Sequence, residues 1–313
     1  MADTLTHLFL VVMLPPLLLG VIVKTKAVFA GRIGPPLFQP YYDLSKLLQK
    51  GTVFSGATTW IFRAGPVVAL AATLLAALLM PLGSHRAAVS FTGDVILFAY
   101  LLALGRFFTA SAALDTGSSF EGMGAAREVT FACLAEPALF LGLLVLARLS
   151  RWEPGSNPSS LSLTGMLQGP LTPEWKVGGA ALVLVLISWF VVLLAENARI
   201  PFDDPNTHLE LTMIHEVMVL DHSGPGLALV LYGAALKLFV FGALVVSVAV
   251  PFSTGNAWAD WGLFLVAMLV LMVVVGVVES VMARLRLVHV PRLLVAACVL
   301  AAFGMILLVS RPL

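Results

Sequence analysis

The segment 196–224 combines side chains that exchange protons. It holds six of the chain's 17 acidic residues and three histidines, His208, His215 and His222. Carboxylates and imidazoles at the edge of a membrane are typical of proton or cation handling. The plainer alternative is an acidic loop that stays in water. Against it, Glu196 and Glu210 border or enter apolar stretches, where a merely solvated loop would carry no charge.

Charged residues also interrupt the long apolar runs. A charge inside a membrane costs a few kcal/mol on insertion scales, so each one requires a partner, an aqueous cavity or a function. Glu136 is followed by Pro137, whose missing backbone donor loosens a helical turn and leaves room for water beside the carboxylate. For Asp94 and Arg106 the plainer alternative to a function is snorkelling at a helix end or a structural ion pair. The intramembrane charges are Asp94, Arg106, Glu136, Glu196, Lys237 and Glu279.

The composition indicates an integral membrane protein. Hydrophobic residues make up 60% of the chain and charged residues 11%, with a mean hydropathy of +1.01, values outside the range of soluble globular domains. The net charge of +1 and the lack of a basic tract argue against nucleic-acid binding. Cys133 and Cys298 stand far apart in apolar runs and are expected to be buried free thiols, so no ligand set for an iron–sulfur cluster is predicted.

Eight apolar runs are long enough to cross a bilayer, which takes about 20 residues of helix. The predicted fold class is an all-α integral membrane protein with about eight transmembrane helices. Residues 1–313 form a single transmembrane domain without an internal repeat. The predicted spans are approximately 5–23, 66–82, 91–113, 129–149, 177–195, 226–250, 261–282 and 289–309.

The distribution of Lys and Arg predicts the orientation. These residues are concentrated in the odd-numbered loops, which places those loops in the cytoplasm. The protein is then expected in the cell inner membrane with both termini outside. The cytoplasmic loops are approximately 24–65, 114–128, 196–225 and 283–288.

Motifs of soluble enzymes do not fit this chain. His215-Glu216 begins like a zinc-protease motif, but Val219 stands where the second His would be. Gly122 and Gly124 form a Gly-x-Gly without the third glycine of a nucleotide-binding loop. No catalytic or metal-binding residue is therefore predicted.

The segment 31–50 is a turn rich in Gly and Pro followed by a short amphipathic helix. Leu44, Leu47 and Leu48 are expected to share one face of this helix, and the polar residues Asp43, Lys46 and Lys50 the other. Such a helix suits the membrane interface and a docking edge equally well.

Several motifs in a consistent order carry a family resemblance. They are Arg32-Ile-Gly-Pro-Pro, Gln39-Pro40, Asp43-Leu-Ser-Lys-Leu47, the separation of Arg127 and Glu136, Arg199-Ile-Pro-Phe-Asp203 with Glu210-Leu211, and Arg284-Leu-Arg286. Over nearly the whole chain they resemble the NuoH family, the membrane subunit of respiratory complex I that abuts its hydrophilic arm. The resemblance implies about eight tilted helices around a polar cavity that opens to the cytoplasm.

The acidic segment departs from the respiratory pattern. It has Asn206 and His208 where complex I proteins commonly carry acidic residues, and it gains Asp204. The run 201–216 is instead similar to the corresponding subunit of group 4 membrane-bound nickel–iron (NiFe) hydrogenases, of the formate hydrogenlyase and hydrogenase-4 type. Membership in this branch implies electron transfer that needs no quinone in the membrane.

The resemblance implies a subunit that links a hydrophilic redox module to an ion-translocating membrane arm. The implied partners are hydrogenase large and small subunits, or their complex I-like equivalents, and antiporter-like membrane subunits. These partners would carry the NiFe centre and the iron–sulfur clusters, and this chain would bind no cofactor. The expected relay for protons or sodium is Glu136, Glu196, Asp203, Asp204, Glu210, Glu216 and Glu279. The expected docking or cavity residues are Arg32, Gln39, Asp43, Lys46, Arg127, Arg199, Arg284 and Arg286.

Other interpretations stay open. Glu279 is near enough in the sequence to pair simply with Arg284 or Arg286. A quinone-reducing complex I subunit would line its cavity with residues 32–47 and the acidic loop. A stand-alone secondary transporter would usually show internal repeats, which are not found. A membrane anchor without an ion role is disfavoured by the charges Glu136 and Lys237.

Overall fold

Eight long helices make up most of the protein. The computed structural model describes residues 2–150, 161–167, 171–203 and 213–310. Each of the eight helices is long and apolar enough to cross a membrane, which confirms the predicted fold class. They are α1 (Ala2–Phe29), α3 (Trp60–Leu79), α4 (Asp94–Asp115), α5 (Ser119–Ser150), α7 (Thr172–Glu196), α8 (Gly224–Ala249), α9 (Ala257–Val281) and α10 (Val290–Val309).

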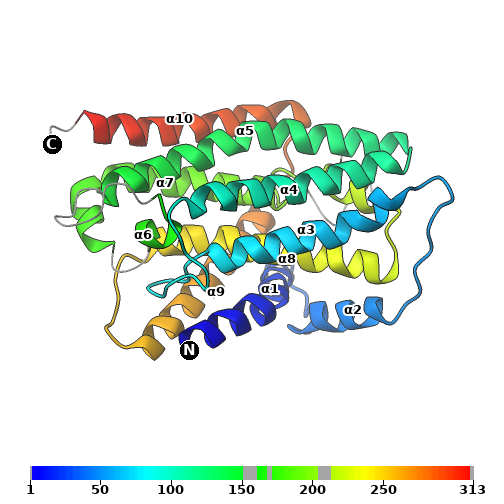
Figure 1. The fold of residues 1–313 in the computed structure, drawn as a ribbon, viewed down its shortest axis with the longest axis horizontal. Coiled ribbons are helices and arrows are strands. Elements are labelled where there is room, and N and C mark those ends of the chain that lie inside the picture. The colour runs from blue at the N-terminus through cyan, green and yellow to red at the C-terminus, as the bar shows by residue number, and fades with distance from the viewer. Residues whose placement is uncertain (1, 151–160, 168–170, 204–212, 311–313) are drawn as a thin grey trace.

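Four short elements connect the long helices. They are the helices α2 (Gln39–Leu48) and α6 (Leu163–Leu167) and the 3₁₀ turns η1 (Glu216–Val219) and η2 (Leu287–His289). Most of the long helices run along the longest axis of the molecule, whereas α1 and α9 are inclined to it (Figure 1). Helix α3 packs between α4 and α8, α10 packs on α5 and α7, and α1 packs on α9 and α8.

The helices are longer than the apolar runs that predict them. The segment 114–128, expected to be a loop, is mostly helical, because α5 begins at Ser119. This prediction is wrong for a physical reason. Glu121, Arg127 and Glu128 lower the local hydropathy, but hydropathy marks the part of a helix that fits hydrocarbon and not the residue at which the helix begins.

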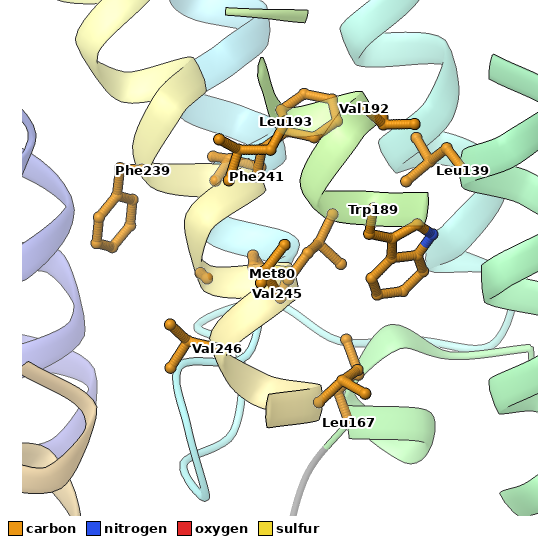
Figure 2. Close-up of a cluster of buried hydrophobic side chains, with 14 of the residues drawn as sticks. Met80, Leu139, Leu167, Trp189, Val192, Leu193, Phe239, Phe241, Val245 and Val246 are labelled. Atoms are coloured by element: carbon orange, nitrogen blue, oxygen red, sulfur yellow. The ribbon is translucent and has the colours of Figure 1, made fainter. Parts of the chain in front are cut away.

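The core between α5, α7 and α8 is filled by large apolar side chains (Figure 2). Trp189 of α7 is buried in this core, as is Met80, which follows α3, whereas Phe239 lies on the opposite side of α8, beside Phe264 of α9 (Figure 2). At Gly142 of α5 an added Cβ would overlap the indole ring of Trp189. Glycine therefore sets how closely α5 and α7 approach, as small residues do where membrane helices cross.

Helix α2 forms where the amphipathic pattern predicts it, and it has no buried residue. It contacts α1 and α8. Leu44 and Leu47 are half-buried against them, but Leu48 is 57% exposed. Leu48 lies one helical turn after Leu44, at the exposed end of the predicted apolar face, and the role of this face stays a prediction.

Both cysteines are free, but Cys133 is exposed. Its predicted burial is wrong because an apolar run in a membrane protein faces lipid as readily as the core. Cys298 is half-buried, and its Sγ donates a hydrogen bond to the carbonyl oxygen of Leu134 at 3.1 Å.

Candidate functional site

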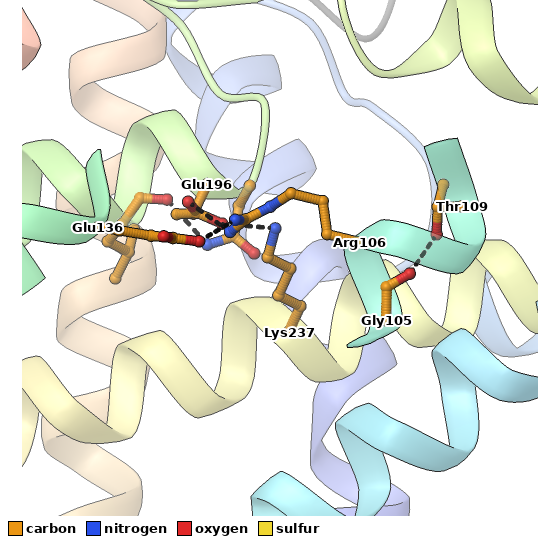
Figure 3. Close-up of polar contacts among 8 residues, drawn as sticks. Gly105, Arg106, Thr109, Glu136, Glu196 and Lys237 are labelled. Atoms are coloured by element: carbon orange, nitrogen blue, oxygen red, sulfur yellow. Dashed lines mark hydrogen bonds and ion pairs between the residues drawn. The ribbon is translucent and has the colours of Figure 1, made fainter. Parts of the chain in front are cut away.

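Four charged side chains from four helices meet inside the helix bundle. Arg106 lies in α4 and Glu136 in α5, while Glu196 is the last residue of α7 and Lys237 lies halfway along α8. Figure 3 shows their charged ends pointing toward one another. Arg106 and Lys237 both contact Glu196, and Glu136 contacts Arg106. The four residues are called the central cluster below.

Glu196 is the centre of this arrangement. Its Oε1 and Oε2 each lie 2.9 Å from Nη2 of Arg106. The ammonium of Lys237 lies 2.8 Å from Oε2. Arg106 turns its other terminal nitrogen to the carboxylate of Glu136, with which it forms an ion pair. Arg106 therefore connects the two carboxylates.

Charge balance explains why the central cluster is stable in a low-dielectric environment. Its formal charges, two positive and two negative, cancel. Glu196 stands at the carboxyl end of α7, where the helix dipole disfavours an anion. Two cations offset this cost as well as the cost of removing the carboxylate from water. The side chain of Glu196 is only 4% exposed, whereas that of Glu136 is 38% exposed.

A small cavity of about 80 Å³ borders the central cluster. Its polar lining residues are Thr73, Arg106, Thr109, Glu128, Glu196, Asn197, His215 and Lys237. One water molecule needs about 10–15 Å³ of such volume and several polar partners. The cavity thus has room and hydrogen-bonding groups for a few waters between the segment that contains His215 and the buried carboxylates.

A larger cavity of about 490 Å³ also borders Arg106 and Glu196. Its walls come mainly from α4 and α5 and are largely apolar, and Arg106, Glu136 and Glu196 lie at its polar end. Tyr100 and Phe140 line the cavity and are themselves exposed. Glu136 therefore borders a space that opens to the outer surface of the helix bundle.

Glu279 belongs to a second cluster. Its Oε2 lies 2.8 Å from Nζ of Lys26 in α1, and its Oε1 lies 3.5 Å from Nη1 of Arg199. The expected pairing of Glu279 with Arg284 or Arg286 is wrong. Helix α9 ends at Val281 and the chain continues in extended conformation through Met282, which carries both arginines away from Glu279.

Asp203 fastens the base of the acidic segment. It is 1% exposed and accepts backbone hydrogen bonds from Ile214 at 2.9 Å and His215 at 3.1 Å. Its other oxygen lies 2.8 Å from Nη2 of Arg284. Asp203 therefore joins the two described parts of this segment, 196–203 and 213–224, beside the turn that follows α9.

The other residues predicted for the relay, and Arg127 from the docking set, lie in different surroundings. Asp204 and Glu210 lie outside the described residues. Glu216 begins η1 and is half-buried. Arg127 donates a hydrogen bond to the carbonyl oxygen of Met213 at 2.8 Å, so it binds main chain at this position.

The predicted docking residues do not form one set, because four precede or belong to α2 whereas Arg127, Arg199 and Arg284 form the inward contacts described above. Arg32, Asp43 and Lys46 are exposed, and Gln39 is half-buried and donates a hydrogen bond to Asp43 at 2.8 Å. Arg286 is also exposed. An added Cβ at Gly20 in α1 would overlap the carbonyl oxygen of Leu37, so glycine permits the chain before α2 to lie directly on α1.

Asp94 takes no part in the central cluster. It is fully buried at the beginning of α4 and accepts hydrogen bonds from the Ser162 hydroxyl at 2.8 Å and the Leu163 backbone N–H at 2.6 Å. Arg106 stands 12 residues further along the same helix, which is about 18 Å at 1.5 Å per residue. Asp94 therefore joins the beginning of α4 to the beginning of α6, and its burial does not fit the snorkelling expected at a helix end.

Sequence reasoning missed Glu128 and did not single out His215 among the loop histidines. Glu128 precedes Glu136 by eight residues, a helical spacing that places both on the same side of α5. This spacing was a usable signal, but it required α5 to begin before residue 128. The place of His215 beside the cavity depends on the fold of the loop and had no signal in the sequence.

The two described histidines of the segment have unusual surroundings. Burial lowers the pKa of His215, against the opposing effect of Glu128 and Asp203, which raise it. Burial also lowers the pKa of His222, whose ring stacks on Phe62 at a centroid distance of 4.1 Å. Both imidazoles are therefore neutral at pH 7 in this fold.

The comparison with known proteins gives consistent relatives. Hydrogenase-4 component C of Escherichia coli (strain K12) is 33% identical over 288 residues, which cover 90% of this chain and 87% of that protein. Formate hydrogenlyase subunit 4 of the same organism is 33% identical over 284 residues, 89% of each chain. An NADH-quinone oxidoreductase subunit of Koribacter versatilis (strain Ellin345) is 25% identical and matches 74% of this chain and 55% of its own length.

A solved structure shows the same fold. A chain of the membrane-bound sulfane sulfur reductase, an archaeal respiratory membrane complex, superposes with a TM-score of 0.80 over 98% of both chains, at 22% sequence identity. The family model described as NADH dehydrogenase matches residues 3–310. This chain is thus a multi-pass membrane protein that belongs to the NADH dehydrogenase family of NuoH-like membrane subunits, whose members include hydrogenase-4 component C and formate hydrogenlyase subunit 4.

Proposed function

We propose that this chain links the hydrophilic redox module of a hydrogenase complex of the formate hydrogenlyase and hydrogenase-4 type to an ion-translocating membrane arm. In this role it couples electron transfer to the translocation of protons or sodium. The 33% identity to two hydrogenase subunits over about nine tenths of the chain supports the choice of branch.

The central cluster is the observation that carries the coupling role. Buried charges are costly, and a membrane anchor does not require them. In this chain they extend from Asp203 in the acidic segment, past the small cavity at Glu196, to Glu136 beside the larger cavity. A change of charge at the acidic segment acts on Glu136 through Arg106, because electrostatic coupling is strong where the dielectric constant is low.

The proposal assigns two sets of partners. Hydrogenase large and small subunits, with the NiFe centre and iron–sulfur clusters, dock on the cytoplasmic side at the exposed residues Arg32, Asp43 and Lys46. Antiporter-like subunits lie beside it in the membrane. The positive-inside rule places both chain termini outside the inner membrane in this arrangement.

A quinone-reducing complex I subunit is the second candidate function. The family description and the 25% identity to a subunit of an NADH-quinone oxidoreductase support it. In that case the partners would contain no nickel, and inhibitors that act at quinone sites would stop electron transfer.

Purification of the tagged chain from its own membranes separates the two functions. Mild detergent extraction, identification of the co-purifying chains, and assays for nickel and for hydrogen oxidation test the branch directly. Nickel and hydrogen-oxidising activity in the purified complex are the expected result. A quinone-reducing assembly without nickel would overturn the proposed function in favour of the second candidate.

The coupling role is tested with Glu136→Gln in membrane vesicles. Ion movement is expected to fall, while hydrogen oxidation with an artificial acceptor stays largely unchanged. Asp94→Asn is the matched control, because it also changes a buried carboxylate but lies outside the central cluster. Equal loss of both activities in an assembled Glu136→Gln complex would rule out the relay role.

A further inference from the structure

His215 of the acidic segment lines the small cavity next to the buried carboxylate of Glu196. It directly precedes η1, and its backbone N–H is held by Asp203 at 3.1 Å. The residue is half-buried, and it lines the small cavity together with Glu128, Glu196 and Lys237. Its position is therefore fixed through the main chain, while the ring borders a space with room for water.

We propose that His215 is the residue through which protons pass between the cytoplasmic segment and the carboxylates of the small cavity, with Glu128 as the first acceptor inside. The inference rests on the proposed coupling function and names the transported ion as the proton. It also gives a role to two residues outside the central cluster.

The pairing pattern of the cavity favours Glu128 as the acceptor. Glu196 is held by both Arg106 and Lys237, so its oxygens are already occupied by cations. Among the residues that the structure describes, Glu128 has neither an ion pair nor a hydrogen bond within the usual distances. A carboxylate without a fixed partner can bind and release a proton without breaking an ion pair.

The chemistry of the imidazole suits the same step. A neutral ring accepts a proton on one nitrogen while the other nitrogen carries its own proton. Protonated His215 then gives a proton to a cavity water, which passes one to the Glu128 carboxylate. The imidazole returns to its neutral form and the carboxylate becomes a carboxylic acid. Charge and protons balance, and no other reactant is needed.

The surroundings disfavour the protonated form of the ring. Burial lowers the pKa of His215, and Lys237 of α8 lowers it further. Glu128 of α5, Glu196 of α7 and Asp203 of the following loop act in the opposite direction. Arg106 of α4 also lines the cavity. A ring that is neutral at pH 7 and flanked by carboxylates takes up a proton only transiently, as transfer requires.

The test uses His215→Gln in the complete complex, purified and reconstituted in vesicles. The rate of proton movement during hydrogen turnover is measured against pH. The variant is expected to move protons about a hundredfold more slowly than the natural chain, the usual effect of losing a positioned proton-transfer group. Its pH profile should also lose the limb that an imidazole produces. Added imidazole should restore proton movement in His215→Ala, whereas a structural defect would not respond.

His222→Gln is the matched control. His222 is the other described histidine of the same loop, but it stacks on Phe62 and does not line the small cavity. This variant is expected to keep the limb of the pH profile that His215 produces. If His215→Gln fails to assemble, Glu128→Gln tests the same step from a different helix and should give the same slow, flat profile.

The outcomes separate this inference from the proposed function. An unchanged rate and pH profile in His215→Gln or in Glu128→Gln, in a complex whose natural form pumps protons, would overturn the inference alone. Movement of sodium without protons in the natural complex would also overturn it. Turnover without any ion movement in the natural complex would overturn the proposed function itself.

Discussion

Lys237 and Glu196 form an ion pair of 2.8 Å between the middle of α8 and the last residue of α7. Through this pair the carboxylate of Glu196 offsets the charge of Lys237 in an apolar helix. Glu196 also binds Arg106. Removing one member of a buried pair leaves the other charge uncompensated, which is costlier than never having buried either charge.

Replacement of Lys237 by Met is therefore expected to destabilise the protein by about 3 kcal/mol, the lower end for breaking a buried pair, because Glu196 retains Arg106. Ion movement should fall with it. Thermal unfolding of the purified complex and ion movement in vesicles measure the two effects. The double variant Lys237→Met with Glu196→Gln should recover part of the lost stability, and a strictly additive loss would contradict the pairing.

Replacement of Asp203 by Ala is expected to loosen the base of the acidic segment. The backbone N–H groups of Ile214 and His215 would lose their acceptor, at about 1–3 kcal/mol for each donor left unsatisfied. Limited proteolysis should then cut the segment faster, and a smaller amount of the hydrophilic partner subunits should co-purify. Asp43→Ala, at an exposed position, controls for loss of a surface charge, and equal protease resistance of Asp203→Ala and the natural chain would refute the fastening role.

Acid is expected to open the turn around His222. Because burial lowers the pKa of His222 in the docked turn, the undocked ring binds a proton more tightly. Docking is thus strongest above the ordinary imidazole pKa of about 6.5 and weakens as the pH falls below it. Amide hydrogen exchange over 216–222, corrected for the intrinsic effect of pH, measures the opening. In His222→Phe, which keeps a ring against Phe62, this pH dependence should disappear; its persistence would assign it to another group.

Replacement of Gly142 by Ala is expected to destabilise the crossing of α5 and α7 by about 1–3 kcal/mol, the usual cost of overpacking. The new methyl group would overlap the indole ring of Trp189. Thermal unfolding measures the loss. Trp189→Phe in the same chain removes the ring atoms nearest to the methyl group and should restore part of the stability, whereas no recovery would place the strain elsewhere.

How much of the fold and of the site could be predicted depends on what hydropathy and the family motifs each measure. Hydropathy belongs to each stretch of sequence separately, so all eight membrane helices were predictable. The family motifs gave the branch. Neither signal indicates which helices pack against one another. The contacts among Arg106, Glu136, Glu196 and Lys237 are therefore seen only in the fold.

Glu279 shows why closeness in sequence misleads. Arg284 is only the fifth residue after Glu279, but the extended backbone after α9 directs that arginine to Asp203. Glu279 instead pairs with Lys26 and Arg199, which come from distant parts of the chain. Pairs within one helix follow a fixed spacing, whereas pairs across a helix end depend on how the chain turns.

The zero formal charge of the central cluster also constrains how such a chain can evolve. A lineage that exchanges Lys237 for a neutral residue is left with an excess anion, and the same holds for Arg106. Neutral drift at one position is therefore blocked until a compensating change arises at another. Comparison of distant relatives should show these four positions gained and lost together, as a single inherited unit.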